Sequence, residues 1–330
     1  MNPWCVEVSR GHLCESQHIG HGIAMTASGD VVLAFGEIDR PTFPRSAAKW
    51  VQALELVASG ASDAFQLSDA ELAIACASHN GEPDHTALVA SWLARLGLSE
   101  ADLECGIAPA FTESVRLAMA RDHTPLSQLH HCCSGKHTGM LTVCRHRGWP
   151  TKGYTEVDHP LQQAIRSHMN TLFECDTDRL EVATDGCSVP TYALPLRQLA
   201  FGFARLGAGH LPTPLKESAE RLFHAQVKEP FMVAGSDRVD TALLEAGAGR
   251  LQVKMGAEGV YCGALPDRHI GFALKCEDGS LRGQEALVIA LLEALDEVAI
   301  VNRLPESMRH PTITTARGLD VGAISVRRET

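Results

Sequence analysis

The order of hydrophobic patterns along the chain places the strongest limit on its fold. Short apolar runs bounded by glycine or proline, which are typical of strands, occur near both ends. Runs with helical spacing fill the middle. We therefore predict an α+β fold in which an antiparallel sheet with packed helices, completed by the two chain ends, accompanies a helical subdomain.

The predicted strands form two groups. Near the start, residues 21–26 and 31–36 flank Ser28-Gly29-Asp30, which indicates a β-hairpin with a glycine turn. Toward the end, glycines and Pro266-Asp267 separate short runs that favour a meander. The expected later strands are residues 251–254, 260–264, 270–274 and 320–326.

The predicted helices begin after Pro44, where apolar residues take a helical period that ends near Gly60. Ser68 and Glu71 have the spacing of a capping box. Further helices are expected at residues 87–96, 134–147, 161–173 and 285–298. Strands and helices do not alternate, which argues against a parallel doubly wound sheet. We expect one catalytic unit over residues 1–330.

The net charge and the hydrophobic pattern of the chain argue against nucleic-acid binding, secretion and membrane crossing. The formal net charge of −11, without a cluster of lysine and arginine, disfavours a nucleic-acid partner. The first residues lack a secretory signal, and no apolar segment is long enough to cross a membrane. We therefore expect a cytoplasmic protein whose eleven cysteines are reduced, some of them free to bind metal.

Ser46 and Lys49 form the first candidate catalytic pair. Three-residue spacing on a helix places the hydroxyl and the amine on one face. An uncharged lysine can remove the serine proton and so create a nucleophile. The alternative is coincidence, because Ser-x-x-Lys is expected about once in an average chain of this length.

Two further segments offer catalytic groups of the same kind. Residues 78–85 are a dense polar set at a predicted helix exit, beginning with Ser78 and His79, although a solvated turn would have the same composition. Lys254 is a lone lysine in an apolar strand flanked by glycines. Its alternative role is a side chain that extends to solvent.

Two other segments carry thiols, imidazoles and an amine, which are groups that can bind a metal. Residues 130–137 include Cys133 and Lys136 at a predicted helix start, where the helix N-terminus favours a thiolate. Cys187 follows an apolar segment and is expected in a loop that could meet Cys133. The spacing matches none of the usual paired-cysteine zinc signatures, so a buried structural cysteine is an equal alternative.

Together these segments resemble the rhizobial-type L-asparaginases, also called the asparaginase II or class 3 family, in content and order. Each motif alone is weak, but five in the same order are specific. The motifs are Pro44-Arg45-Ser46-Ala47-Ala48-Lys49, Gly81-Glu82-Pro83-x-His85, Cys133-Ser134-Gly135-Lys136-His137, Asp185-Gly186-Cys187 and Lys254-x-Gly256-Ala257-Glu258-Gly259. Cys132 and Trp50 depart from the family pattern.

The resemblance implies hydrolysis of L-asparagine to aspartate and ammonia, on a fold similar to serine β-lactamases and serine-dependent glutaminases. It also implies a homodimer and a zinc ion that modulates the enzyme without being strictly required. The family positions carry over as the tandems Ser46 with Lys49 and Ser78 with Lys254, and as a zinc site. The implied zinc ligands are Cys133, Lys136 and Cys187.

The expected mechanism begins with attack of Ser46 on the side-chain amide while Lys49 accepts the proton, with Ser78 and Lys254 as a relay. The opposite order, with Ser78 as nucleophile, stays open. The substrate also carries an α-ammonium and an α-carboxylate, so the pocket needs an anion and a cation or donor. Our candidates for substrate binding are Arg45, His79 and Asp185.

Three other functions fit parts of the same sequence. A serine hydrolase of glutamine or of a β-lactam would use the same Ser-x-x-Lys helix and lysine strand. A zinc metallohydrolase would use metal-bound water as its nucleophile. A cysteine-based zinc or redox sensor would use the thiols but gives no role to Ser46, Lys49 or Lys254.

Overall fold

The computed structural model describes residues 1–328, and the chain divides into two compact units. The first comprises Met1–Ala47, Ala193–Ala208 and Ala242–Thr330, and the second comprises Ala48–Tyr192 and Gly209–Thr241. Both units are discontinuous in sequence. The prediction of one catalytic unit over the whole chain stays a prediction.

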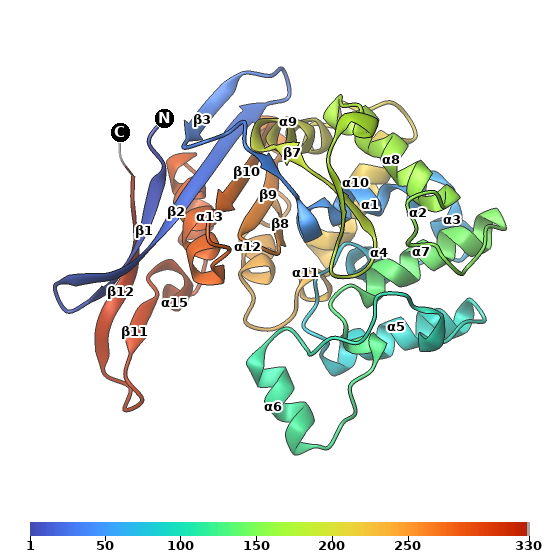
Figure 1. Cartoon of the computed structure of the whole chain (residues 1–330), viewed down its shortest axis with the longest axis horizontal. Helices are drawn as coiled ribbons and strands as arrows, with labels where there is room; N and C mark the ends of the chain where they lie inside the picture. Colours follow the sequence, from blue (N-terminus) through green and yellow to red (C-terminus); the bar gives the residue numbers. More distant parts are fainter. Residues whose placement is uncertain (329–330) are drawn as a thin grey trace. The chain divides into compact units, whose positions relative to one another are not determined.

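The first unit contains an antiparallel sheet of eight strands (Figure 1). Seven strands follow the spatial order β11-β12-β1-β2-β10-β9-β8, and β3 pairs with β2. The sheet is completed by the two chain ends, as predicted, because β1 pairs with β12 and places Val6 opposite Val326. The strands are β1 (Trp4–Arg10), β2 (Leu13–Thr26), β3 (Val31–Phe35), β8 (Gln252–Gly256), β9 (Val260–Leu265), β10 (Ile270–Cys276), β11 (Thr312–Thr314) and β12 (Asp320–Arg327).

Helices α9 (Leu196–Gly207) and α13 (Leu281–Ala294) pack against this sheet. A Cβ at Gly271 in β10 would lie 2.1 Å from the backbone nitrogen of Ala204, so only glycine allows α9 to approach so closely. The remaining elements of this unit are short: β4 (Pro41–Thr42), the 3-10 helix η1 (Arg45–Ala48), β7 (Leu194–Pro195), η5 (Pro266–Arg268), α14 (Val298–Val301) and α15 (Glu306–Arg309). Helix α12 (Val239–Gly247) joins the second unit to the first.

The second unit is mainly helical. Its long helices are α5 (Pro83–Arg95), α7 (Ser134–Arg147), α8 (Pro160–Phe173) and α10 (Leu215–Lys228). Strands β5 (Val182–Thr184) and β6 (Pro190–Tyr192) form a small hairpin. The shorter helices are α1 (Lys49–Gln52), α2 (Leu54–Ala58), α3 (Ala61–Ala64), α4 (Asp69–Ala75), η2 (Glu100–Asp102), α6 (Glu113–Arg121), η3 (Gln128–His130), η4 (Thr177–Arg179) and α11 (Pro230–Val233).

Helix α7 is the central helix of this unit. Every residue from Ser134 to Cys144 is buried, and the helix ends at Gly148, which adopts a left-handed conformation. A Cβ at Gly135 would lie 2.5 Å from the carbonyl oxygen of Ile74, so α7 packs directly on the end of α4. The N-terminus of α7, with Cys133 as its N-cap residue, therefore lies inside the unit.

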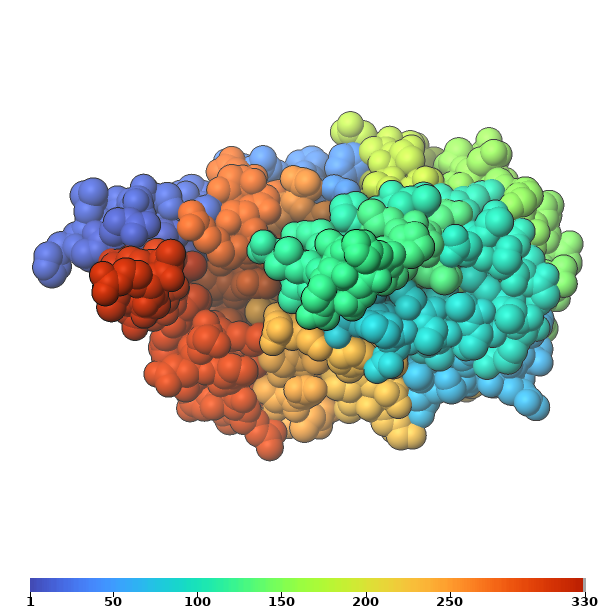
Figure 2. All heavy atoms as spheres, turned by 90° about the horizontal axis from the view of Figure 1, so that it is seen from below, coloured from blue at the N-terminus to red at the C-terminus, as the bar shows by residue number. Residues whose placement is uncertain are grey.

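None of the residues of helix α6 is buried. In Figure 2 the surrounding segment, coloured green, lies at the front of the view. Within residues 1–328, no helix combines the length and the apolar character that a membrane crossing requires.

Most predicted elements occur where the sequence placed them. Ser68 and Glu71 form the expected capping box of α4, and the hairpin of β2 and β3 is present. The last long helix begins at Leu281 rather than residue 285, because Ser280 accepts a hydrogen bond from the backbone of Gly283 and caps it. The predicted helix after Pro44 is divided into η1, α1 and α2.

Candidate active site

Within the first unit, the Arg45–Ala48 turn lies against strand β8. A Cβ at Gly256 would come 2.5 Å from the carbonyl oxygen of Pro44, so this glycine permits the contact. Lys254 is two residues earlier on β8 and therefore faces the same side of the strand. Its side chain is fully buried, and its Nζ donates to the carbonyl oxygen of Met255 at 2.8 Å.

Within the second unit, Lys49 contacts Ser78. The Lys49 side chain has no solvent exposure. Its Nζ lies 2.9 Å from Ser78 Oγ and also donates to the carbonyl oxygen of Ala77. The structure thus places the lysine of the first predicted tandem beside the serine of the second.

The backbone around Ser78 is held by hydrogen bonds to several parts of the same unit. The amide of Ser78 donates to Val233 and the amide of Asn80 donates to Ala234. Between them, His79 donates to the carbonyl oxygen of Cys132. These bonds place the Ser78 hydroxyl at a fixed position beside Lys49.

Arg238 supports the same segment through hydrogen bonds. Its guanidinium donates to the carbonyl oxygen of Ser78 at 3.1 Å and to Asn80 Oδ1 at 2.9 Å. The guanidinium lies 3.9 Å from the centre of the Phe111 ring, a cation–π contact. Arg238 is 5% exposed, so these donors act away from bulk water.

Glu82 completes this network. Its carboxylate accepts hydrogen bonds from Asn80 Nδ2 and from the backbone and hydroxyl of Ser236. Burial by itself raises the pKa of Glu82, but these hydrogen bonds outweigh it and lower the pKa below its ordinary value. Glu82 therefore remains ionised and fixes the turn that precedes α5.

His79 uses both ring nitrogens within the protein. Nδ1 accepts from the amide of Gly81, so Nε2 carries the proton and donates to Ser134 Oγ at 3.0 Å. Burial, with His85 and Lys49 nearby, lowers the pKa of His79 well below its ordinary value. The ring also stacks on His85. The predicted role of His79 in substrate binding stays a prediction.

The three predicted zinc ligands lie together in the second unit. Lys136 Nζ donates to Cys187 Sγ at 2.9 Å, and Cys133 interacts with Cys187. Cys132 acts to raise the pKa of Cys133, but the contact with Cys187 and the charge of Lys49 lower it overall. The contact with Cys133, together with burial, raises the pKa of Cys187.

The donor set fits a zinc ion. Two sulfurs and one nitrogen are donors that zinc accepts, and three protein ligands leave one tetrahedral position. Burial acts to lower the pKa of Lys136, but the neighbouring sulfurs raise it above its ordinary value. Zinc binding would therefore have to displace a proton from Lys136, because an ammonium has no lone pair to donate.

Asp185 lies beside this cluster. The loop between β5 and β6 turns back on itself, because the amide of Asp185 donates to Val189 and the amide of Ser188 donates to Asp185. Asp185 Oδ2 lies 3.7 Å from Cys187 Sγ. The loop therefore presents the predicted ligand Cys187 and the predicted substrate-binding Asp185 together.

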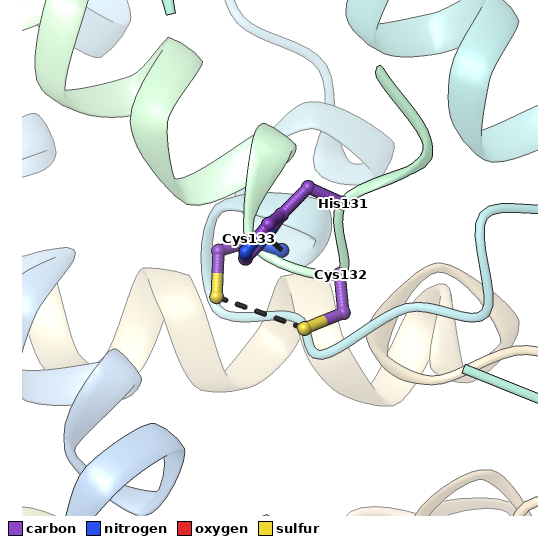
Figure 3. Close-up of side chains that lie close together, drawn as sticks. All are labelled: His131, Cys132 and Cys133. Carbon is purple, nitrogen blue, oxygen red and sulfur yellow. Dashed lines mark hydrogen bonds between the residues drawn. The ribbon is translucent and has the colours of Figure 1, made fainter. Parts of the chain in front are cut away.

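A second set of possible metal ligands shares Cys133. Ligand atoms of His131, Cys132 and Cys133 lie within 4.8 Å of one another (Figure 3). However, His131 Nδ1 accepts from the amide of Cys133 at 3.0 Å, so in a neutral ring Nε2 carries the proton. His131 has no free lone pair for a metal while this hydrogen bond persists.

Another possible cluster lies in the first unit, where His18, Cys276 and Asp278 approach one another. His18 Nδ1 contacts Asp278 at 2.7 Å, and Nε2 accepts from Arg282 at 2.9 Å. The Arg282 cation occupies the side of the ring that a metal would need. This cluster is better described as a hydrogen-bonded chain from Arg282 through His18 to Asp278.

Sequence reasoning missed several residues around these groups. Arg238 stands alone after a Gly-Ser-Asp turn, with no spacing that relates it to Ser78. Asn80 and Glu82 belong to the polar segment that was noticed, but their partners lie more than 150 residues away. His131 and Cys132 belong to the His/Cys segment, which was the signal available for them.

The family model described as L-asparaginase II matches residues 6–326. The chain therefore belongs to the L-asparaginase II family, in agreement with the resemblance of its motifs. Family membership supports an amidohydrolase that acts on a small molecule. Among curated proteins, none matches the chain.

Several solved structures are similar to this chain. Mglu in its native form is 16% identical, with a TM-score of 0.47, and the match covers 84% of this chain and 64% of that one. A β-lactamase from Mycobacterium bovis is 14% identical, with a TM-score of 0.43 and coverages of 85% and 95%. A D-alanine carboxypeptidase AmpC from Burkholderia cenocepacia is 11% identical, with a TM-score of 0.40 and coverages of 86% and 93%.

Replacing Arg238 by methionine tests the support of the Ser78 segment. The change leaves the Ser78 carbonyl oxygen and Asn80 Oδ1 without these donors, and we expect the free energy of unfolding to fall by about 1–3 kcal/mol. Displacement of Ser78 should also lower the rate of amide hydrolysis about tenfold or more. Urea denaturation and ammonia release measure the two effects.

Arg221→Met is the matched control, because Arg221 pairs with exposed Asp63 in the same unit. We expect it to cost less than about 1 kcal/mol and to leave turnover unchanged. Equal effects of the two substitutions would contradict the role given to Arg238.

Proposed function

We propose that this protein is an L-asparagine amidohydrolase that forms a covalent aspartyl ester on a serine activated by lysine. The observation that carries the proposal is the 2.9 Å contact between the buried Lys49 Nζ and Ser78 Oγ. A base within hydrogen-bond reach of a hydroxyl is the arrangement that nucleophilic catalysis requires. The five motifs, in their family order, support a side-chain amide as the substrate.

Lys49 is the shared base in this mechanism. As an uncharged amine, it donates one N–H to the carbonyl oxygen of Ala77, and its lone pair is free for a hydroxyl proton. Ser46 attacks the amide carbon, Lys49 takes the Ser46 proton, and Ser78 passes a proton toward the leaving nitrogen. The C–N bond breaks, ammonia leaves, and water then hydrolyses the ester to aspartate.

The second candidate mechanism has Ser78 as the nucleophile, and the short distance between Lys49 Nζ and Ser78 Oγ favours it. In that order Ser78 attacks and Ser46 belongs to the relay with Lys254. Both orders use the same four residues and form the same ester. They differ in the serine that carries the aspartyl group.

Arg45 and Asp185 are proposed to bind the α-carboxylate and α-ammonium of asparagine, because their charges are opposite to those groups. His79 is proposed as a further substrate-binding residue. Both ring nitrogens of His79 already have hydrogen-bond partners in Gly81 and Ser134. In this proposal His79 therefore contacts the substrate with the face of its ring, or acts on it through Ser134.

Cys133, Lys136 and Cys187 are proposed to hold a zinc ion. When bound, zinc supplies a positive charge that orders the site and attracts the substrate. It is modulatory in this proposal, because the serines already provide a nucleophile. A cytoplasmic location and a homodimer remain predictions from the sequence and the family resemblance.

The substrate is tested by measuring ammonia released from L-asparagine and L-glutamine. We expect much faster release from asparagine, because one added methylene in a fitted pocket changes binding by about 1–3 kcal/mol. Benzylpenicillin hydrolysis serves as a third arm for the β-lactamase alternative. Equal rates on the two amides, or none on asparagine, would contradict the substrate assignment.

The serine and lysine roles are tested by Ser46→Ala, Ser78→Ala, Lys49→Met and Lys254→Met. Lys49→Met should nearly abolish turnover at every pH, because the base itself is lost, whereas Lys254→Met should keep a reduced rate. Mass spectrometry after acid quenching identifies the serine that carries the aspartyl ester. An inactive Lys254→Met with an active Lys49→Met would reverse the two roles.

The zinc site is tested by Cys133→Ser and Cys187→Ser. Each should weaken zinc retention and mainly raise the KM for asparagine, because the ion is proposed to order the site rather than supply the nucleophile. Cys262→Ser is the matched control, since Cys262 is a buried thiol in the other unit. Zinc-replete wild-type protein that holds no zinc would show that the site is wrong.

A further inference from the structure

A buried histidine beside the proposed zinc ligands has no part in the mechanism above. His137 is fully buried in α7. Its Nε2 has no partner at ordinary hydrogen-bond geometry within residues 1–328, but the ring interacts with Cys187. Its Nδ1 lies 2.8 Å from Tyr154 Oη, and the two rings meet edge to face. If Nδ1 accepts a hydrogen bond from that hydroxyl, the ring is neutral and its single N–H is on Nε2.

The position of His137 on α7 directs it toward the proposed metal site. Cys133, Lys136 and His137 are spaced i, i+3 and i+4, so their side chains share one face of the helix. Lys136 on that face contacts Cys187, and His137 also interacts with Cys187. A neutral imidazole there could either bind the metal through Nε2 or donate an Nε2–H to a sulfur.

The hydrogen bonds of Tyr154 decide between these two roles. The amide of Glu104 donates to Tyr154 Oη at 2.8 Å. The hydroxyl proton of Tyr154 then needs an acceptor, and His137 Nδ1 is the partner in reach. If Nδ1 carried the proton instead, this buried hydroxyl would have no acceptor within residues 1–328, which is unfavourable.

We propose that Tyr154 fixes His137 as the Nε2–H tautomer, so that His137 donates to the sulfur of Cys187 and stays outside the coordination sphere of the metal. His137 is then a positioning residue. The metal role rests on the zinc site of the proposed function. The hydrogen-bond chain Glu104–Tyr154–His137 does not need the metal.

This tautomer has a consequence for the metal. With His137 as a fourth ligand the site would be closed, as in structural zinc sites. With His137 as a donor to Cys187, three protein ligands leave one position for an exchangeable ligand. Tyr154 thereby keeps the site open although a fourth donor atom, His137 Nε2, is within the cluster.

The tautomer is measured directly by two-dimensional 15N–1H NMR of protein labelled with 15N-histidine. The His137 signals are those lost in His137→Gln. We expect a protonated Nε2 and an unprotonated Nδ1 in the metal-free protein, unchanged after one equivalent of zinc. A metal-bound Nε2 with a protonated Nδ1 in the zinc-loaded protein would overturn the proposal.

Zinc affinity provides an independent measurement by competition with a chelator. His137→Leu removes the N–H donor and should weaken zinc binding about 10–100-fold, the usual effect of losing a group that supports a metal ligand. His137→Gln retains an N–H and should stay within about threefold of wild type. Equal large losses in both variants would indicate a lost ligand and overturn the proposal.

Tyr154→Phe removes the hydroxyl that holds the tautomer. We expect the His137 proton to move at least partly to Nδ1, after which Nε2 becomes a zinc ligand in the NMR spectrum. Tyr192→Phe is the control, because the buried Tyr192 hydroxyl has no hydrogen bond within residues 1–328. An unchanged tautomer in a folded Tyr154→Phe protein would contradict the role of Tyr154.

If the protein binds no zinc, the metal site of the proposed function is wrong, and the metal-free spectrum still decides the tautomer. A protonated Nε2 in that spectrum supports the Tyr154–His137 chain. A protonated Nδ1 overturns it whether or not zinc binds. The two failures are therefore distinguishable.

Discussion

The hydrogen bond between Lys49 and Ser78 depends on a wholly buried amine, and the rest of the second unit is arranged around that requirement. A buried amine must be hydrogen-bonded, and the Ala77 carbonyl and the Ser78 hydroxyl provide its partners. The partners keep their positions because the Ser78–Asn80 backbone is bonded to Val233, Ala234 and Cys132. Segments far apart in sequence therefore determine the distance between Lys49 Nζ and Ser78 Oγ.

The same principle governs the thiol cluster at the start of α7. Gly135 lets this helix end approach α4, and the helix face then carries a thiol, an amine and an imidazole into a buried volume. Each polar group finds a neighbour there: Lys136 contacts Cys187, and His137 contacts Tyr154. The serine–lysine pair and the thiol cluster are linked through the backbone, because the backbone amide of His79 donates to the carbonyl oxygen of Cys132.

Much of the fold was predictable because its signals are local. The capping box of Ser68 and Glu71, the glycine stop of α7 at Gly148 and the turn before β3 each depend on a few adjacent residues. Sequence reasoning missed helix α9 and strand β1. The match of the family model confirms the family inferred from the five motifs.

The sequence by itself determined which chemical groups the chain carries: paired serines and lysines, a Cys-x-x-Lys-His helix start and an Asp-Gly-Cys loop. Tertiary structure alone decided their partners. It placed Ser78 beside Lys49, it placed Arg238 where it donates to the Ser78 carbonyl oxygen, and it placed the Tyr154 hydroxyl beside His137 Nδ1. The reason is physical: local spacing fixes the face on which a side chain lies, but a buried polar group takes its partner from whichever segment the packing brings within hydrogen-bond distance.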